Sequence, residues 1–136
     1  MATASAFIDV PASAEQVWQL IGGFNSLPDW LPFIVKSELS EGGRVRSLET
    51  ADGAVVVERL EGFDNAAKTY SYSIEQAPFP ATDYLATLRV EAQGQGTRVT
   101  WSGRFTANGV TDAEVEALFN GIYQGGLEAL RANYPA

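Results

Sequence analysis

The residues best suited to chemistry in this sequence are Arg46 and Glu58, which stand in two neighbouring strand-like stretches. Side chains alternate between the two faces of a strand, so Arg46 faces inward if Leu48 does. In the next strand-like stretch, the same alternation can place Glu58 on the inward face. An inward carboxylate needs a charged partner, and Arg46 is the natural one. The opposite alternation is also open: Val55 and Val57 would face inward, and both charges would lie in solvent.

A buried Arg46–Glu58 pair has two interpretations. It can anchor the carbonyl or hydroxyl group of a ligand, or act as an acid and a base. It can also be a satisfied buried pair that only fixes the register of the two strands. Tyr72 or Tyr84 can supply a further hydroxyl to this group.

A second group of candidate binding residues is aromatic. Three later stretches alternate clearly, and their apolar positions are Tyr70, Tyr72 and Ile74, then Tyr84, Ala86, Leu88 and Val90, and finally Val99, Trp101, Gly103 and Phe105. Ordinary core packing explains any one of these rings. Several polar-tipped rings on one face need hydrogen-bond partners when buried, however, and a partly hydrated pocket supplies these more readily than a dry core.

Two residue types that dominate catalytic sites are missing, because the sequence contains 0 histidines and 0 cysteines. Their absence excludes thiolate nucleophiles, Ser-His-Asp triads, cysteine zinc sites and most haem and transition-metal sites. The acids Asp29, Asp83 and Asp112 are scattered and form no calcium-binding loop. We therefore expect no metal and no cofactor.

The charge balance narrows the possible partners. The 136 residues include 9 basic and 17 acidic side chains, a formal net charge of −8. Such a chain repels a phosphate backbone, so we expect neither nucleic acid nor an anionic membrane surface as a partner. The sequence has no apolar run long enough to span a membrane and no visible signal peptide, so we expect a cytoplasmic protein. The length fits one domain over residues 1–136, as a monomer or a homodimer.

These side chains need a framework, and the sequence predicts mostly strands. Alternating stretches separated by turn residues predict strands at 4–10, 34–40, 44–50, 54–63, 68–76, 83–92 and 97–106. Their short connections make neighbouring strands antiparallel. Between the first two strands, Ser13 and Gln16 form a capping-box pattern that opens a helix, and residues 25–31 predict a second, shorter helix.

The last segment predicts a long amphipathic helix. Thr111 and Glu114 form a second capping box, and an apolar stripe follows at Val115, Leu118, Phe119, Ile122, Tyr123, Leu127 and Leu130. Gly121, Gly125 and Gly126 interrupt it, and each costs about 1 kcal/mol relative to alanine inside a helix. Gly126 falls beside the stripe, where a small residue makes room for a ligand or lets the sheet approach closely. A curved seven-stranded antiparallel sheet around one long helix is an α+β fold.

Several segments in this order resemble a known superfamily. They are VPASAEQVWQLIGGFNSLPDWLP (10–32), GRVRSLETADG (43–53), VERLEGFDN (57–65), KTYSYSI (68–74), TDYLATLRV (82–90) and GTRVTWSGRF (96–105). Together they resemble the START-like or SRPBCC superfamily, also called the birch-pollen-allergen fold, and within it the polyketide cyclase/dehydrase-like branch. The resemblance covers nearly the whole chain and implies the helix-grip fold, with two short helices after the first strand and a cavity between the sheet and the C-terminal helix.

The resemblance also implies a function for that cavity. It predicts a small, mostly hydrophobic ligand, lipid or polyketide-like, that enters past the loops at 51–53 and 77–80, where Phe79 stands between two prolines. The candidate binding residues are Arg46, Leu48, Glu58, Tyr70, Tyr72, Phe79, Tyr84, Trp101, Leu118, Ile122 and Gly126.

Two other functions are compatible with the same residues. The first is a cofactor-independent polyketide cyclase or dehydratase, in which Glu58 is the acid/base, Arg46 orients a carbonyl and a tyrosine donates a proton. The second is an accessory module that binds another protein through Phe79 or the exposed face of the sheet.

Overall fold

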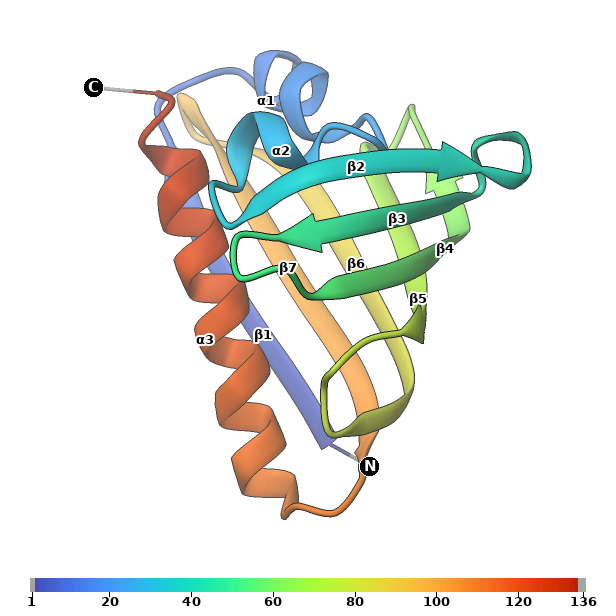
Figure 1. Cartoon of the computed structure of the whole chain (residues 1–136). Coiled ribbons are helices and arrows are strands. Elements are labelled where there is room, and N and C mark those ends of the chain that lie inside the picture. The colour runs from blue at the N-terminus through green and yellow to red at the C-terminus, as the bar shows by residue number, and fades with distance from the viewer. Residues whose placement is uncertain (1, 135–136) are drawn as a thin grey trace.

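Seven antiparallel strands form one curved sheet in the computed structural model, which describes residues 2–134. The strand order is β1-β7-β6-β5-β4-β3-β2, so the first and second strands of the sequence are the two edges (Figure 1). The strands are β1 (Ala2–Val10), β2 (Ile34–Ser40), β3 (Val45–Thr50), β4 (Val55–Asp64), β5 (Thr69–Gln76), β6 (Ala81–Gln93) and β7 (Gly96–Ala107). This confirms the predicted α+β architecture and its helix-grip arrangement.

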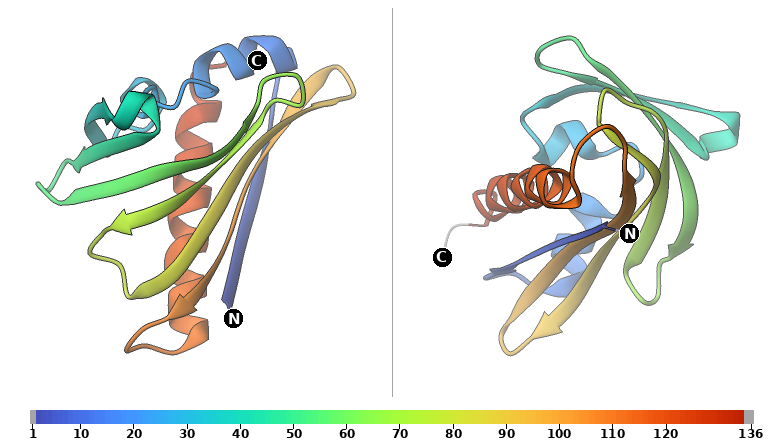
Figure 2. Two further views of the ribbon diagram at one scale, coloured as in Figure 1. Left: turned by 90° about the vertical axis from the view of Figure 1, so that its right-hand side faces the viewer. Right: turned by 90° about the horizontal axis from the view of Figure 1, so that it is seen from below.

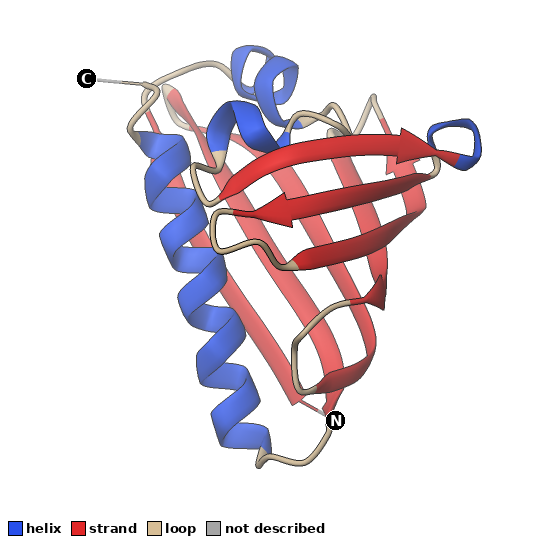
Figure 3. Ribbon diagram, in the orientation of Figure 1, coloured by secondary structure: helices blue, strands red, loops and turns tan. Residues whose placement is uncertain are grey.

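The helices begin at the predicted caps. Before α1 (Ala14–Ile21), the Ser13 hydroxyl accepts a hydrogen bond from the Gln16 amide at 3.2 Å, and the Gln16 side chain accepts one from the Ser13 amide at 3.1 Å. The Thr111 hydroxyl caps α3 (Asp112–Arg131) by accepting from the Glu114 amide at 3.1 Å. The second helix, α2 (Leu27–Trp30), is shorter than the predicted 25–31: Ser26 is its N-cap, without a side-chain cap hydrogen bond, and Leu31 is its C-cap, where the backbone becomes extended. A 3-10 turn, η1 (Glu41–Gly43), joins β2 to β3 (Figure 3).

The sheet curves around α3, as the view along the helix shows (Figure 2, right). Side chains of α3 also cover the free edge of β1: Glu116 Oε2 accepts from the Thr3 amide at 2.9 Å, and Asn120 Oδ1 accepts from the Ser5 amide at 3.0 Å. These two bonds satisfy edge amides that would otherwise be open to another chain. Within residues 2–134, no helix is both long and apolar enough to span a membrane.

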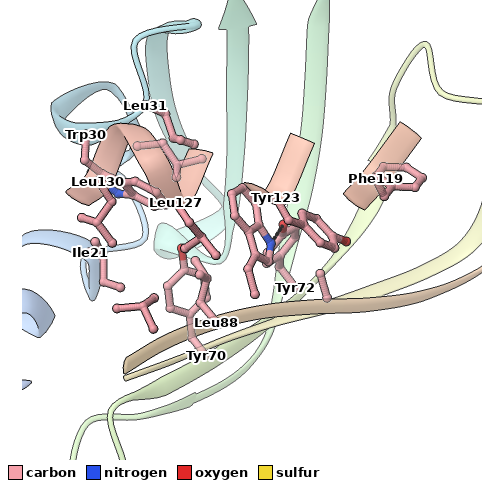
Figure 4. Packing of buried hydrophobic residues seen from close by; sticks show 14 of the residues in the cluster. Ile21, Trp30, Leu31, Tyr70, Tyr72, Leu88, Phe119, Tyr123, Leu127 and Leu130 are labelled. Atoms are coloured by element: carbon pink, nitrogen blue, oxygen red, sulfur yellow. Dashed lines mark hydrogen bonds between the residues drawn. The ribbon is translucent and has the colours of Figure 1, made fainter. Parts of the chain in front are cut away.

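The concave face carries the core, and aromatic rings dominate it (Figure 4). The rings of Trp101 and Tyr123 stack with centroids 4.7 Å apart, and Phe119 lies 4.7 Å from Phe105. The predicted inward positions of β5, β6 and β7 are largely buried, which confirms the alternation found in the sequence.

Glycines in α3 serve packing at one position only. A Cβ at Gly126 would lie 2.8 Å from Cζ3 of Trp101 and 2.9 Å from Cδ2 of Leu31, so only glycine lets the helix approach these side chains. A Cβ at Gly121 or Gly125 would meet nothing within 4 Å. Close approach, and not room for a ligand, therefore explains Gly126.

Alanine substitutions at adjacent glycines distinguish a position of close packing from a position with open space. We expect Gly125→Ala to stabilise the protein by about 1 kcal/mol through helix propensity alone. Gly126→Ala should be less stable than Gly125→Ala by about 1–3 kcal/mol, because its methyl group overpacks the contact with Trp101. Denaturant unfolding of both variants measures the difference, and equal stability would contradict the close-approach explanation.

Candidate functional site

A cavity of about 380 Å³ lies between the concave face of the sheet and α3. Its wall is mostly apolar, and the loops at 51–53 and 77–80 contribute to it. The lining residues are Leu27, Leu31, Phe33, Ile34, Leu48, Thr50, Ala51, Asp52, Ala54, Val56, Glu58, Tyr72, Ile74, Pro78, Phe79, Tyr84, Trp101, Phe119, Ile122 and Tyr123.

The Arg46–Glu58 pair is buried at one end of this region. The two residues are direct cross-strand partners on β3 and β4. Arg46 is 1% exposed and Glu58 is 6% exposed, whereas Val55 on the same strand as Glu58 is 42% exposed. The alternation that turns both charges inward is therefore the one adopted. The Arg46 Nε atom donates to Glu58 Oε1 at 2.8 Å, and Nη2 lies 2.7 Å from the same oxygen.

Backbone, hydroxyl and aromatic groups complete the surroundings of Arg46. Its Nη1 atom donates to the Phe24 carbonyl at 2.8 Å and to the Tyr70 hydroxyl at 3.4 Å. The guanidinium carbon lies 4.2 Å from the Phe24 ring centroid and 4.9 Å from that of Tyr72. Burial alone lowers the pKa of Arg46, but Tyr70 and Glu58 more than offset this effect, so its pKa is raised and it stays charged.

Glu58 faces the cavity, which Arg46 does not. Both contacts from Arg46 reach Oε1, so Oε2 is left without that partner. Burial raises the pKa of the Glu58 carboxyl above its ordinary value, although Arg46 acts in the opposite direction. A carboxylate here balances the buried guanidinium, whereas a protonated Glu58 would leave that charge unpaired.

Tyrosine hydroxyls line the cavity beside Glu58. The Trp101 indole donates to the Tyr72 hydroxyl at 3.0 Å, and the hydroxyls of Tyr84 and Tyr123 hydrogen-bond to each other. Burial raises the pKa of Tyr72 and Tyr84 well above the ordinary value, and it also raises that of Tyr123. All three are therefore neutral hydroxyls that can donate or accept a hydrogen bond.

Phe79 closes the side of the cavity formed by the loop at 77–80. Its ring meets that of Phe119 on α3 edge-on, with centroids 5.3 Å apart. The ring is half-buried against the core, so it is a wall of the cavity more than a free surface group.

Comparison with known proteins establishes the family. The profile described as "Polyketide cyclase / dehydrase and lipid transport" matches residues 1–134. The chain belongs to this family. No curated protein matches the sequence. The structure is similar to that of the protein XoxI from Bacillus cereus, with 51% identity, a TM-score of 0.96, and coverage of 98% of this chain and 96% of that one.

More distant structures share the fold. A START superfamily protein from Mycobacterium smegmatis is 17% identical with a TM-score of 0.79, over 98% of this chain and 97% of that one. The di-domain ARO/CYC protein BexL of the BE-7585A biosynthetic pathway is 22% identical with a TM-score of 0.81, over 98% of this chain and 46% of that one. These similarities confirm the fold that the sequence resemblance implies, and the matching profile confirms its polyketide cyclase/dehydrase-like branch.

In this member of the polyketide cyclase/dehydrase and lipid transport family, the cavity brings together seven of the candidate residues. They are Leu48, Glu58, Tyr72, Phe79, Tyr84, Trp101 and Ile122. Four other candidates lie elsewhere. Arg46 and Tyr70 are buried behind the wall, Gly126 packs on Trp101, and Leu118 is 37% exposed over an outer groove beside Phe33.

Sequence reasoning missed several lining residues of this family member. The sequence assigns Phe119 and Tyr123 only to the apolar stripe of the last helix. Their spacing alone marks them as buried; a binding role emerges only when α3 is placed opposite β5 and β6. Within residues 2–134, no group of three or more carboxylates is arranged to hold a metal ion.

Removing one member of the buried pair should be more harmful than removing both. We expect Arg46→Met alone to lower the free energy of unfolding by about 3–5 kcal/mol, because it leaves Glu58 buried and unpaired. The double variant Arg46→Met/Glu58→Leu should recover most of that loss. Guanidinium unfolding of the variants measures the coupling, and a double variant as unstable as the single one would contradict this account.

Proposed function

We propose that this protein binds a small, mostly hydrophobic molecule, lipid or polyketide-like, in the cavity between the sheet and α3. The observation that carries the proposal is a mostly apolar cavity of about 380 Å³ whose lining includes a few polar groups, among them Glu58 and three tyrosine hydroxyls. Its volume falls in the range of about 300–1,000 Å³ that is typical of small-molecule sites. The description of the family, which includes lipid transport, supports the same function.

The polar groups of the cavity are suited to orienting such a molecule. Apolar walls supply the affinity for the hydrophobic part, and a small number of fixed polar groups sets its direction. Glu58 and the hydroxyls of Tyr72, Tyr84 and Tyr123 are those groups, and their own hydrogen bonds hold them in place before a ligand arrives. Such preorganisation lowers the entropy cost of binding.

Filling part of the cavity should weaken binding. We expect the neutral fluorescent probe N-phenyl-1-naphthylamine to bind the wild-type protein with one-to-one stoichiometry. In Val56→Phe the added ring occupies part of the cavity, so affinity should fall about tenfold or more. Fluorescence titration measures both affinities.

The matched control is Val55→Phe, one residue earlier on β4. Val55 is 42% exposed and points away from the cavity, so its substitution should leave the probe affinity unchanged. Equal weakening in the two variants, or no saturable binding to the folded wild type, would refute the proposed function.

Acid–base catalysis is a second candidate function, favoured by one specific observation. Glu58 has a raised pKa and faces the same cavity as Tyr72, so a bound carbonyl compound would meet a proton acceptor and a proton donor together. The similarity to an ARO/CYC protein and the family description point to cyclase or dehydratase chemistry on a polyketide-like compound.

Proton exchange tests this second function directly. With a 3-oxoacyl thioester of N-acetylcysteamine in deuterated buffer, an enzyme should accelerate exchange of the protons between the two carbonyl groups. Glu58→Gln should reduce the accelerated rate by about 10²–10⁴-fold, since the base is lost. Glu61→Gln, at an exposed position of the same strand, is the control. An exchange rate that Glu58→Gln leaves unchanged would remove Glu58 from this role.

A further inference from the structure

The charged residues that line the cavity are all acidic. Its lining includes two carboxylate residues, Asp52 in the entrance loop and Glu58 at the inner end, and no lysine or arginine. The chain as a whole carries a formal charge of −8. An anionic ligand would therefore meet only negative charges inside a poorly hydrated site, where repulsion is strong.

Arg46, the cation paired with Glu58 of the cavity lining, already has a partner in the protein for each of its guanidinium nitrogens. Its Nε and Nη2 atoms contact Glu58, and its Nη1 atom bonds the Phe24 carbonyl and the Tyr70 hydroxyl. Aromatic rings lie against the guanidinium, and the side chain is 1% exposed. A ligand carboxylate entering the cavity cannot reach this guanidinium without displacing Glu58.

Glu58 keeps a free acceptor. Oε1 takes both contacts from Arg46, and Oε2 takes none of them. Within residues 2–134, only Nε1 of Trp30 is a fully enclosed side-chain polar atom without a hydrogen-bond partner. Since Oε2 of Glu58 has no such partner either, it is not fully enclosed and is accessible from the cavity that Glu58 lines. A carboxylate oxygen in apolar surroundings is strongly stabilised by a hydrogen-bond donor.

A ligand hydroxyl group can hydrogen-bond to both Glu58 and Tyr72. The Tyr72 oxygen already accepts from the Trp101 indole, so its own proton can be donated. A ligand hydroxyl can donate to Glu58 Oε2 and accept from a tyrosine hydroxyl at the same time, whereas a carboxylate has no proton to donate and an ether can only accept.

From these contacts we infer that the cavity selects a neutral ligand whose polar end is an alcohol or phenol hydroxyl, and discriminates against the corresponding carboxylate. The inference rests on the proposed binding function and specifies its ligand class. The hydroxyl proton bonds to Glu58, and the apolar body of the ligand lies along Leu48, Val56 and Phe119.

Three probes with one ring system test the selection. They are 2-naphthol, 2-methoxynaphthalene and naphthalene-2-carboxylate, and their affinities for the wild-type protein are measured at neutral pH by displacement of N-phenyl-1-naphthylamine. We expect 2-naphthol to bind about tenfold or more tightly than the ether, which lacks the donor, and the carboxylate to bind most weakly. An ether or a carboxylate that binds as tightly as the naphthol would overturn the inference.

Variants of Glu58 test whether its carboxylate causes the preference for the hydroxyl-bearing ligand. Glu58→Gln keeps the shape but can turn a donor toward the cavity, so the preference for naphthol over the ether should disappear. Because this variant leaves Arg46 without a charged partner, thermal unfolding must first show that it folds. Arg46→Met/Glu58→Leu removes both charges and should also lose the preference while still binding the ether. The control Glu61→Gln should retain the wild-type order.

The outcomes separate the two proposals. If none of the probes, including the displaced fluorophore, binds the folded wild type, the proposed binding function fails. If all bind but naphthol has no advantage, only the inferred ligand class fails. If its advantage survives in both Glu58 variants, the assignment of the selection to Glu58 fails.

Discussion

The ion pair between Arg46 and Glu58 is the constraint on which the rest of the interior depends. Two charges buried between adjacent strands are tolerated only when their remaining donors and acceptors are also satisfied. Here the guanidinium reaches the carbonyl of Phe24, the hydroxyl of Tyr70 and the ring of Tyr72. The pair thereby connects β3, β4 and β5 with the segment between α1 and α2, which is far from them in sequence.

The same pair determines the chemical character of the cavity. Because Glu58 and the surrounding aromatic groups cover Arg46, the cation contributes no positive wall to the ligand space. Around Glu58, the cavity wall presents its carboxylate and several neutral tyrosine hydroxyls, held by their own hydrogen bonds. The absence of histidine and cysteine from the sequence leaves these groups as the main polar ones at the inner end. A single buried charge pair thus sets both the register of the strands and the polarity of the site.

The alternation of side chains predicted much of this arrangement, including the strands, the caps and the aromatic face. It did not predict which half of the concave face would be covered by packed side chains and which half would border the cavity. Tyr70 and Tyr72 share a face, yet the ring of Tyr70 lies 5.8 Å from Phe24 and 6.4 Å from Trp18. These rings come from the α1 region, and their position over the sheet is a tertiary contact that strand periodicity does not encode. Likewise, helical spacing includes Leu118 in the apolar stripe, but only the orientation of α3 shows that it faces outward.

The cavity exists because the two halves of the concave face are covered differently. Near α1 and α2, bulky rings and the close approach of α3 at Gly126 fill the space beneath the helices (Figure 4). Toward the loops at 51–53 and 77–80, a cavity remains between the sheet and α3, and its wall combines aliphatic side chains with rings that include Phe79 and Phe119. Interiors normally pack to the density of organic crystals, so an apolar space of this size is a departure that selection for packing alone would not maintain. The hydroxyls of Tyr72, Tyr84 and Tyr123 lie together in this wall, and the ring of Tyr72 also contacts the guanidinium that pairs with Glu58, so these polar groups can hold one end of a molecule while the rest of it lies along the apolar wall.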